Sequence, residues 1–163
     1  MAKCTLAAIR DECNALLEVA RTSGRLGASL EADVLITVPL FTSTSTSTST
    51  SMAANAQAQE SLLASLSEFE ADLPEVLLVS GVDVVSQGGR GGYSAGRSGE
   101  VSILGEVETE VAVPASETGK QKAVVHLAII PASGKKCRRC WKHTAPTEDQ
   151  VCGRCEAVLA QTA

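Results

Sequence analysis

Apolar side chains recur along the chain with two spacings, one typical of helices and one of strands. Over residues 5–22 they return every three or four positions, which places them on one face of a helix. These apolar positions are Leu6, Ile9, Cys13, Leu16 and Ala20. Gly24 and Gly27 follow as helix stop signals. The same spacing over residues 53–73 predicts a second helix that ends at Pro74.

Four segments are predicted strands. Residues 32–41, 75–85 and 123–130 are rich in Val, Ile, Leu and Ala, as expected of buried strands, whereas residues 101–113 alternate apolar and acidic side chains, as expected of a half-exposed one. This order of elements predicts an α+β fold: a small mixed domain with antiparallel strands and two helices. We place this domain at residues 1–130 and a cysteine module at residues 131–163.

Two segments inside the first domain are predicted flexible insertions. Residues 42–51 are a Thr-Ser repeat with no apolar side chain, so they bury too little surface to offset the entropy cost of ordering. A linker is favoured over a phosphorylation tract. Residues 87–99 contain six glycines. The arginines of that segment, Arg90 and Arg97, could touch phosphate, but a solvated loop is the favoured interpretation.

The bulk composition limits the core and the compartment. The chain of 163 residues is 44% hydrophobic but only 2% aromatic, so a core must be built from aliphatic side chains. Apolar runs stay well below the ~18–20 residues that cross a bilayer. Asp11, Glu12 and Glu18 are untypical of a transit peptide, and a secretory signal is not apparent. We expect a protein that is not secreted and not membrane-bound, in the cytoplasm or in an organellar matrix or stroma.

Two C-x-x-C pairs, separated by eleven residues, predict a metal site near the C-terminus. The ligands are Cys137, Cys140, Cys152 and Cys155. Four sulfurs can complete a tetrahedral shell, and their softness favours one zinc ion, which would be structural because a closed shell leaves no position for a reacting water. Two disulfides, a redox pair and an iron–sulfur cluster are the alternatives.

The residues around the cysteines have predicted roles of their own. Gly153 is expected to supply the conformational freedom of the second turn. His143 is treated as a non-ligand, and Trp141 is expected to pack against the metal site in preference to stacking on a base. The cysteines outside the module, Cys4 and Cys13, are expected to be ordinary thiols.

Charge is distributed unevenly. The net charge is −5, yet residues 134–155 carry +4 and the remainder −9. Four thiolates with Zn²⁺ sum to −2, so the basic residues in part neutralise the site. The surplus suggests an RNA contact formed by Lys135, Lys136, Arg138, Arg139, Lys142 and Arg154.

These motifs resemble a known family. The segment GKKCRRCW at 134–141 with CGRC at 152–155 is similar to the C-terminal zinc finger of bacterial-type, or organellar-type, isoleucyl-tRNA synthetases, and a related finger ends the formamidopyrimidine-DNA glycosylases. IRDECNALLEVAR at 9–21, LGASLEAD at 26–33 and LLVS at 77–80 resemble the synthetases alone. The start of the chain, Met-Ala-Lys, lacks the catalytic proline expected of a glycosylase.

The resemblance implies a tRNA-binding part of an isoleucine–tRNA ligase, with the four cysteines as zinc ligands. Segments like the family's nucleotide-binding signatures are missing, so catalysis and editing would belong to a domain absent from this chain, and no small-molecule substrate site is expected here. tRNA and that catalytic part are the expected partners. The alternative is a free-standing, zinc-stabilised RNA-binding or protein-interaction subunit without enzymatic activity.

Overall fold

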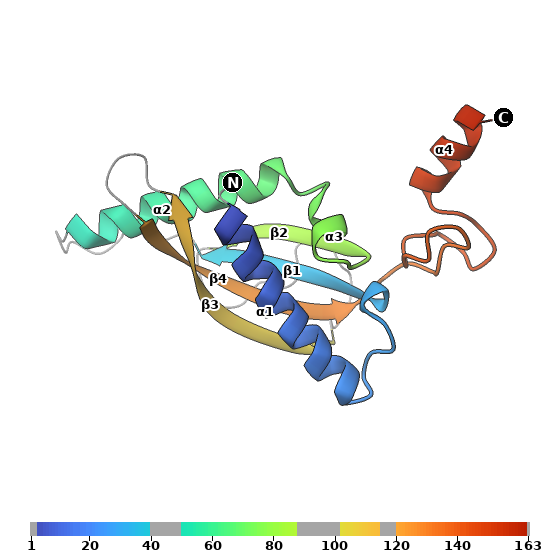
Figure 1. The fold of residues 1–163 in the computed structure, drawn as a ribbon, viewed down its shortest axis with the longest axis horizontal. Coiled ribbons are helices and arrows are strands. Elements are labelled where there is room, and N and C mark those ends of the chain that lie inside the picture. Colours follow the sequence, from blue (N-terminus) through green and yellow to red (C-terminus); the bar gives the residue numbers. More distant parts are fainter. Residues whose placement is uncertain (1–2, 40–49, 88–101, 115–119, 163) are drawn as a thin grey trace.

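A four-stranded mixed sheet with helices packed on it forms most of the molecule (Figure 1). The computed structural model describes residues 3–39, 50–87, 102–114 and 120–162. The elements are α1 (Lys3–Thr22), a short 3-10 helix (Ser29–Glu31), β1 (Ala32–Pro39), α2 (Thr50–Glu68), α3 (Leu73–Val76), β2 (Gly81–Gln87), β3 (Gly105–Pro114), β4 (Lys120–Pro131) and α4 (Gly153–Thr162). The predicted α+β class is confirmed.

The strand order is β2-β1-β4-β3, with β1 and β4 at the centre. β4 pairs antiparallel with both β1 and β3, as predicted. β1 and β2, however, run parallel. The expectation of antiparallel pairing is wrong for this pair, because the chain between them crosses over through α2 and α3 and returns in the same direction.

One hydrophobic core lies between the sheet and the two long helices. Residues 32–38 of β1 are all buried, and alternate residues point to the same face. Val34, Ile36 and Val38 form a single cluster with apolar side chains of α1 and α2, such as Ile9 and Leu66. Both helices therefore cover the same face of the sheet.

Several predicted boundaries need correction. The second helix ends at Glu68, and Pro74 lies in the first turn of α3, where a missing N–H costs nothing. The predicted strand over 75–85 therefore begins only at Gly81. The predicted strand over 101–113 begins at Gly105, and the last strand is longer than predicted. Helices α3 and α4 were not predicted.

The two predicted insertions fall mostly outside the described residues, which omit 40–49 and 88–101. At their margins the prediction is wrong: Thr50 and Ser51 open α2, and Gln87 closes β2. No helix in the described part of the chain has both the length and the apolar character needed to cross a bilayer.

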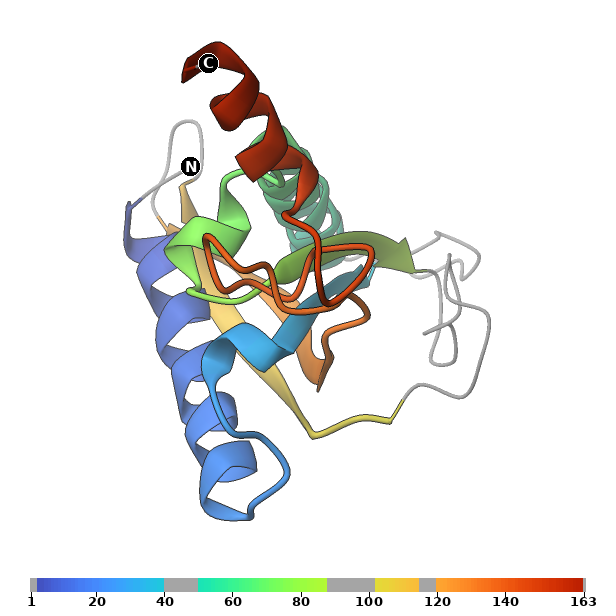
Figure 2. The ribbon, with the colours of Figure 1, turned by 90° about the vertical axis from the view of Figure 1, so that its right-hand side faces the viewer.

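We call residues 3–131 the body and residues 132–162 the cysteine module. The module follows β4 directly and lies beyond one end of the sheet, with α4 projecting away from the body (Figures 1 and 2). In the view onto that end, the module loops lie in front of the strands and close to α3 (Figure 2). The body thus presents α3 and the turn before β2 to the module.

Candidate metal centre

The four predicted cysteines converge on one point. Their sulfur atoms all lie within 4.8 Å of one another, and those of Cys140 and Cys152 are 3.6 Å apart. Four sulfurs at ~2.3 Å from a tetrahedral zinc ion would be about 3.8 Å from each other. Cys137, Cys152 and Cys155 are buried, whereas Cys140 is exposed. The arrangement can hold one metal ion, and its all-sulfur donors suit a soft or borderline ion.

The first C-x-x-C pair lies on a small hairpin. Lys135 and Ala145 exchange two backbone hydrogen bonds, of 2.8 and 2.9 Å. Inside this pair, the Cys137 N–H donates to the Lys142 carbonyl and the Trp141 N–H donates to the Cys137 carbonyl, at 2.8 and 3.0 Å. These bonds fold the backbone tightly enough to aim both sulfurs inward.

Gly134 and Trp141 are the module residues with unusual backbone requirements, whereas the sequence predicted such a requirement at Gly153. A Cβ at Gly134 would lie 2.3 Å from the His143 carbonyl oxygen, so only glycine fits this close approach of the hairpin strands. Trp141 has a φ of 66°, in the left-handed region, and this conformation turns the chain directly after the first C-x-x-C pair. Gly153 begins α4 without a positive φ. The expected role of Gly153 in the second turn is therefore wrong.

The local backbone favours the thiolate form of Cys137. Backbone N–H groups of Cys140 and Cys152 point toward the sulfur of Cys137 and lower the pKa of this thiol from 9.0 to about 6. The Cys152 N–H lies 3.3 Å from that sulfur. A deprotonated sulfur is the form that binds a metal.

The cysteine of the first helix behaves differently. Cys13 is fully buried in the core of the body, and burial raises the pKa of its thiol to about 12. It is an inert packing residue, as predicted. Cys4 lies in α1, and its side chain is outside the described atoms. His143 is not among the residues of the metal cluster.

Trp141 does not pack against the metal site. Its side chain is 62% exposed, and the Lys136 amine lies 5.1 Å from the ring centroid. The predicted packing role is wrong, because the left-handed backbone at this position turns the side chain outward. The ring exposes an apolar face to solvent, and the amine beside it adds a positive charge.

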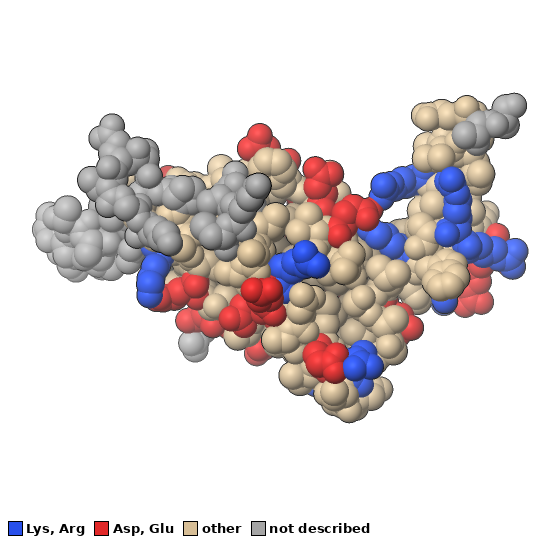
Figure 3. Space-filling view, in the orientation of Figure 1, with Lys and Arg blue, Asp and Glu red and all other residues tan. Residues whose placement is uncertain are grey.

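The six basic residues fall into three groups. Lys135 and Arg138 pair with acids of the module, Glu148 at 3.4 Å and Asp149 at 2.6 Å. Lys142 and Arg154 reach out of the module to the body. Lys136 and Arg139 form no ion pair with an acid among the described residues: Lys136 lies over Trp141, and the Arg139 guanidinium donates to the Cys155 carbonyl at 3.4 Å. Lys and Arg gather over the module, while Asp and Glu spread over the body (Figure 3).

The side chains of two body residues contact the module. The Glu75 carboxylate of α3 accepts hydrogen bonds from Lys142, at 2.9 Å, and from Arg154, and these two bonds lower the pKa of its carboxyl. Ser80 Oγ accepts a hydrogen bond of 2.6 Å from the His143 N–H and donates to the Leu30 carbonyl.

Glu75 and Ser80 were missed as functional residues. They lie more than 60 residues from their module partners in sequence, and no local pattern distinguishes them.

Comparison with known proteins confirms the predicted resemblance. The isoleucine–tRNA ligase of Pseudoalteromonas translucida is 27% identical over 152 residues, which is 90% of this chain. That of Microcystis aeruginosa is 28% identical over 156 residues, or 93% of the chain. The mitochondrial isoleucine–tRNA ligase of Schizosaccharomyces pombe is 30% identical over 102 residues, or 63% of the chain. No family profile matches.

The relatives are much longer than this chain. The aligned residues make up 12% of the P. translucida ligase, 13% of the M. aeruginosa ligase and 9% of the S. pombe ligase. The likeness of the cysteine module to a glycosylase finger stays a prediction.

Proposed function

We propose that this chain is the tRNA-binding C-terminal portion of an isoleucyl-tRNA synthetase-like protein. In this proposal the catalytic part that joins isoleucine to tRNA lies outside these 163 residues. The chain contributes by holding tRNA in place. It would act in the cytoplasm or in an organellar matrix, where reducing conditions keep the four cysteines available as thiolates.

The observation that carries the proposal is the extent of the similarity. About 90% of the chain aligns with bacterial isoleucine–tRNA ligases, so the body is shared as well as the cysteine module. If only the cysteine module were shared, as with a zinc finger like that of a DNA glycosylase, the body would not align with the ligases. The joint match favours a role in aminoacylation over DNA repair.

Zinc is the metal that we propose for the site. Cys137, Cys140, Cys152 and Cys155 would hold it, and a shell of four sulfurs leaves it no open position. The module has few buried apolar side chains of its own, so the metal would fix the positions of its basic residues. Its role would be structural.

The cysteine module supplies the proposed RNA surface. Among the six basic residues of the module, Lys136 and Arg139 are the two that no described acid neutralises, and Trp141 exposes its ring beneath the Lys136 amine. Cations bind the phosphate backbone, and an exposed ring can stack on an unpaired base. Lys135 and Arg138 would contribute less, because exchanging their present partners for phosphate brings a smaller net gain.

The test is tRNA affinity as a function of salt, with the whole chain loaded with zinc. Each phosphate contact adds a slope of about −0.7 to −0.9 to log K against log salt. The double variant Lys136→Ala, Arg139→Ala should flatten the slope by about 1.4 to 1.8. The matched control is Arg10→Ala, Arg25→Ala, which removes two exposed arginines of the body and should leave the slope unchanged.

Two results would count against the proposal. No tRNA binding at low salt would favour the alternative of a protein-interaction subunit, in which the metal only holds the module together. Equal losses from the module variant and the body control would mean that net charge, and not the tip of the module, drives binding.

A further inference from the structure

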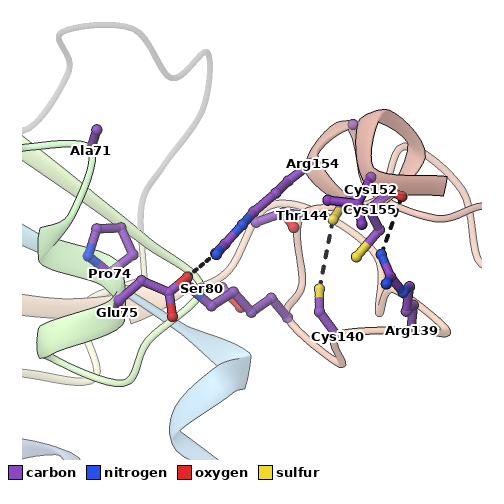
Figure 4. Close-up of a pocket in the computed structure, with 13 residues that line it drawn as sticks. Ala71, Pro74, Glu75, Ser80, Arg139, Cys140, Thr144, Cys152, Arg154 and Cys155 are labelled. Carbon is purple, nitrogen blue, oxygen red and sulfur yellow. Dashed lines mark hydrogen bonds and ion pairs between the residues drawn. The ribbon is translucent and has the colours of Figure 1, made fainter. Parts of the chain in front are cut away.

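A cleft separates the body from the cysteine module, and side chains line it from both sides (Figure 4). Its volume is about 670 Å³, within the ~300–1,000 Å³ range of small-ligand sites. α3 and Ser80, the residue just before β2, contribute to one wall, and the two C-x-x-C segments contribute to the other. In the space-filling view, basic side chains reach across the hollow between the body and the module (Figure 3).

The cleft has an excess of cations. Arg139, Lys142 and Arg154 line it from the module, and Glu75 is the one acid among the lining residues that the structure describes. The Lys142 amine and the Arg154 guanidinium both donate to the same oxygen of Glu75, its Oε1. Arg154 spans the cleft to reach it (Figure 4). Two cations from one wall thus converge on one anionic oxygen from the other.

This geometry also suits a phosphodiester. Arg and Lys bind the free oxygens of a phosphate with the same charge-assisted hydrogen bonds that they give to a carboxylate. A phosphodiester and a carboxylate each carry one negative charge, so an exchange of one for the other leaves the charge of the cleft unchanged. Adding a phosphate while Glu75 stayed in place would add an unbalanced charge, because the metal-bound thiolates beside the cleft already carry about −2.

Glu75 is well placed to leave. Its side chain is 49% exposed, and it lies on α3, a helix of only four residues at the surface of the body. The Arg154 side chain is 74% exposed and the Lys142 side chain 17%, so the pair with Arg154 is well solvated and the pair with Lys142 only in part. Ion pairs that water reaches contribute little to stability. A phosphate delivered by a large polyanion can compete with bonds of that strength.

We propose that this cleft is a phosphate site for RNA, and that Glu75 occupies it while no RNA is bound. Lys142 and Arg154 then contact RNA only after the backbone displaces Glu75, and this acid sets how strongly the site binds. The RNA part of the inference rests on the proposed function. The chemistry of the site, one phosphate between two cations, applies equally to free phosphate.

The first test uses tRNA and the whole zinc-loaded chain. Glu75→Gln keeps the size of the side chain and removes the competing charge. It should raise tRNA affinity about three- to tenfold at low salt and steepen the slope against salt by about 1, because one more phosphate is neutralised. The matched control is Glu156→Gln, an exposed acid of α4 that is not among the residues lining the cleft. It should change the affinity less than twofold and leave the slope unaltered.

The second test uses inorganic phosphate alone and needs no RNA. In the Glu75→Gln chain, millimolar phosphate should shift the NMR signals of the Lys142 and Arg154 side chains. The wild-type chain should need a higher concentration, and Glu75→Gln combined with Lys142→Ala and Arg154→Ala should show no response. Zinc content, measured for each variant, confirms that the module is intact.

The outcomes separate this inference from the proposed function. If tRNA binds neither protein while phosphate still binds the Glu75→Gln chain, the site is supported and its assignment to RNA is overturned. If Glu75→Gln weakens tRNA binding with zinc still bound, Glu75 is a positioning residue and the inference is wrong. If phosphate leaves both signals unchanged and tRNA affinity stays at the wild-type value, the cleft is not a phosphate site.

Discussion

The body and the cysteine module are stabilised in opposite ways. The body buries one continuous aliphatic cluster that includes side chains of α1, α2 and all four strands. The buried cluster of the module consists of Ala145 and three of the four cysteines, with Val151 partly buried against it. Burying an aliphatic side chain contributes about 1.5–3 kcal/mol, so the body can fold on its own core whereas the module cannot. The difference teaches that one chain joins a body with a large core to a module whose buried side chains are mostly the four-cysteine cluster that could hold a metal.

Loss of the metal should separate the two regions most clearly. Cys152→Ser removes one ligand, and the module should unfold because zinc contributes on the order of 10 kcal/mol to such sites. Amide exchange should become fast across residues 134–155 and stay slow in β1 and β4. The control is Cys13→Ala, which removes a thiol outside the site and should leave the zinc content unchanged. A module that kept its protection without metal would contradict the comparison.

A cavity in the core should have the converse effect. Leu66 is fully buried between α2 and the sheet, and Leu66→Ala should lower the free energy of unfolding of the body by about 2–5 kcal/mol. Urea denaturation followed by circular dichroism measures this loss, and zinc should remain bound through the transition. Val19→Ala, at a side chain that is 56% exposed, should stay within about 0.5 kcal/mol of wild type. Release of zinc together with unfolding of the body would show that the regions are one unit.

The smallest effect is expected where the two regions meet. Ser80→Ala leaves the His143 N–H without its partner, at a cost of about 1 kcal/mol. Exchange of the His143 amide should become several-fold faster while the zinc content hardly changes, and the lost bond to the Leu30 carbonyl should lower the stability of the body only slightly. Ser23→Ala, which removes a similar hydrogen bond at the end of α1, serves as control and should leave His143 unaffected. No change at His143 would mean that the contact does not hold the module.

Much of this arrangement could be predicted from local patterns. The spacing of Ile9 and Cys13 gave α1, and the repeat of two cysteine pairs gave the ligand cluster, because periodicity and ligand spacing are local properties. Pro74 was misleading, since a proline ends one helix or begins another with equal ease. The outward position of Trp141 follows from a left-handed φ that its residue type does not indicate.

The contact between the regions could not be predicted. Glu75 contacts Lys142 and Arg154 because the crossover through α3 places it near one end of the sheet. The module begins at that same end, where β4 stops. Such pairings depend on tertiary structure, and a charge count cannot assign them. They also divide the six basic residues of the module into those that pair with an acid and those that do not, a division that the sequence does not show.

The most direct test of the account is tRNA affinity of the same chain before and after removal of its metal. Chelation should abolish the salt-dependent part of binding, and stoichiometric zinc should restore it, while circular dichroism reports an intact body throughout. tRNA binding that persists at full strength without metal would contradict the claim that a metal-held tip contacts the RNA.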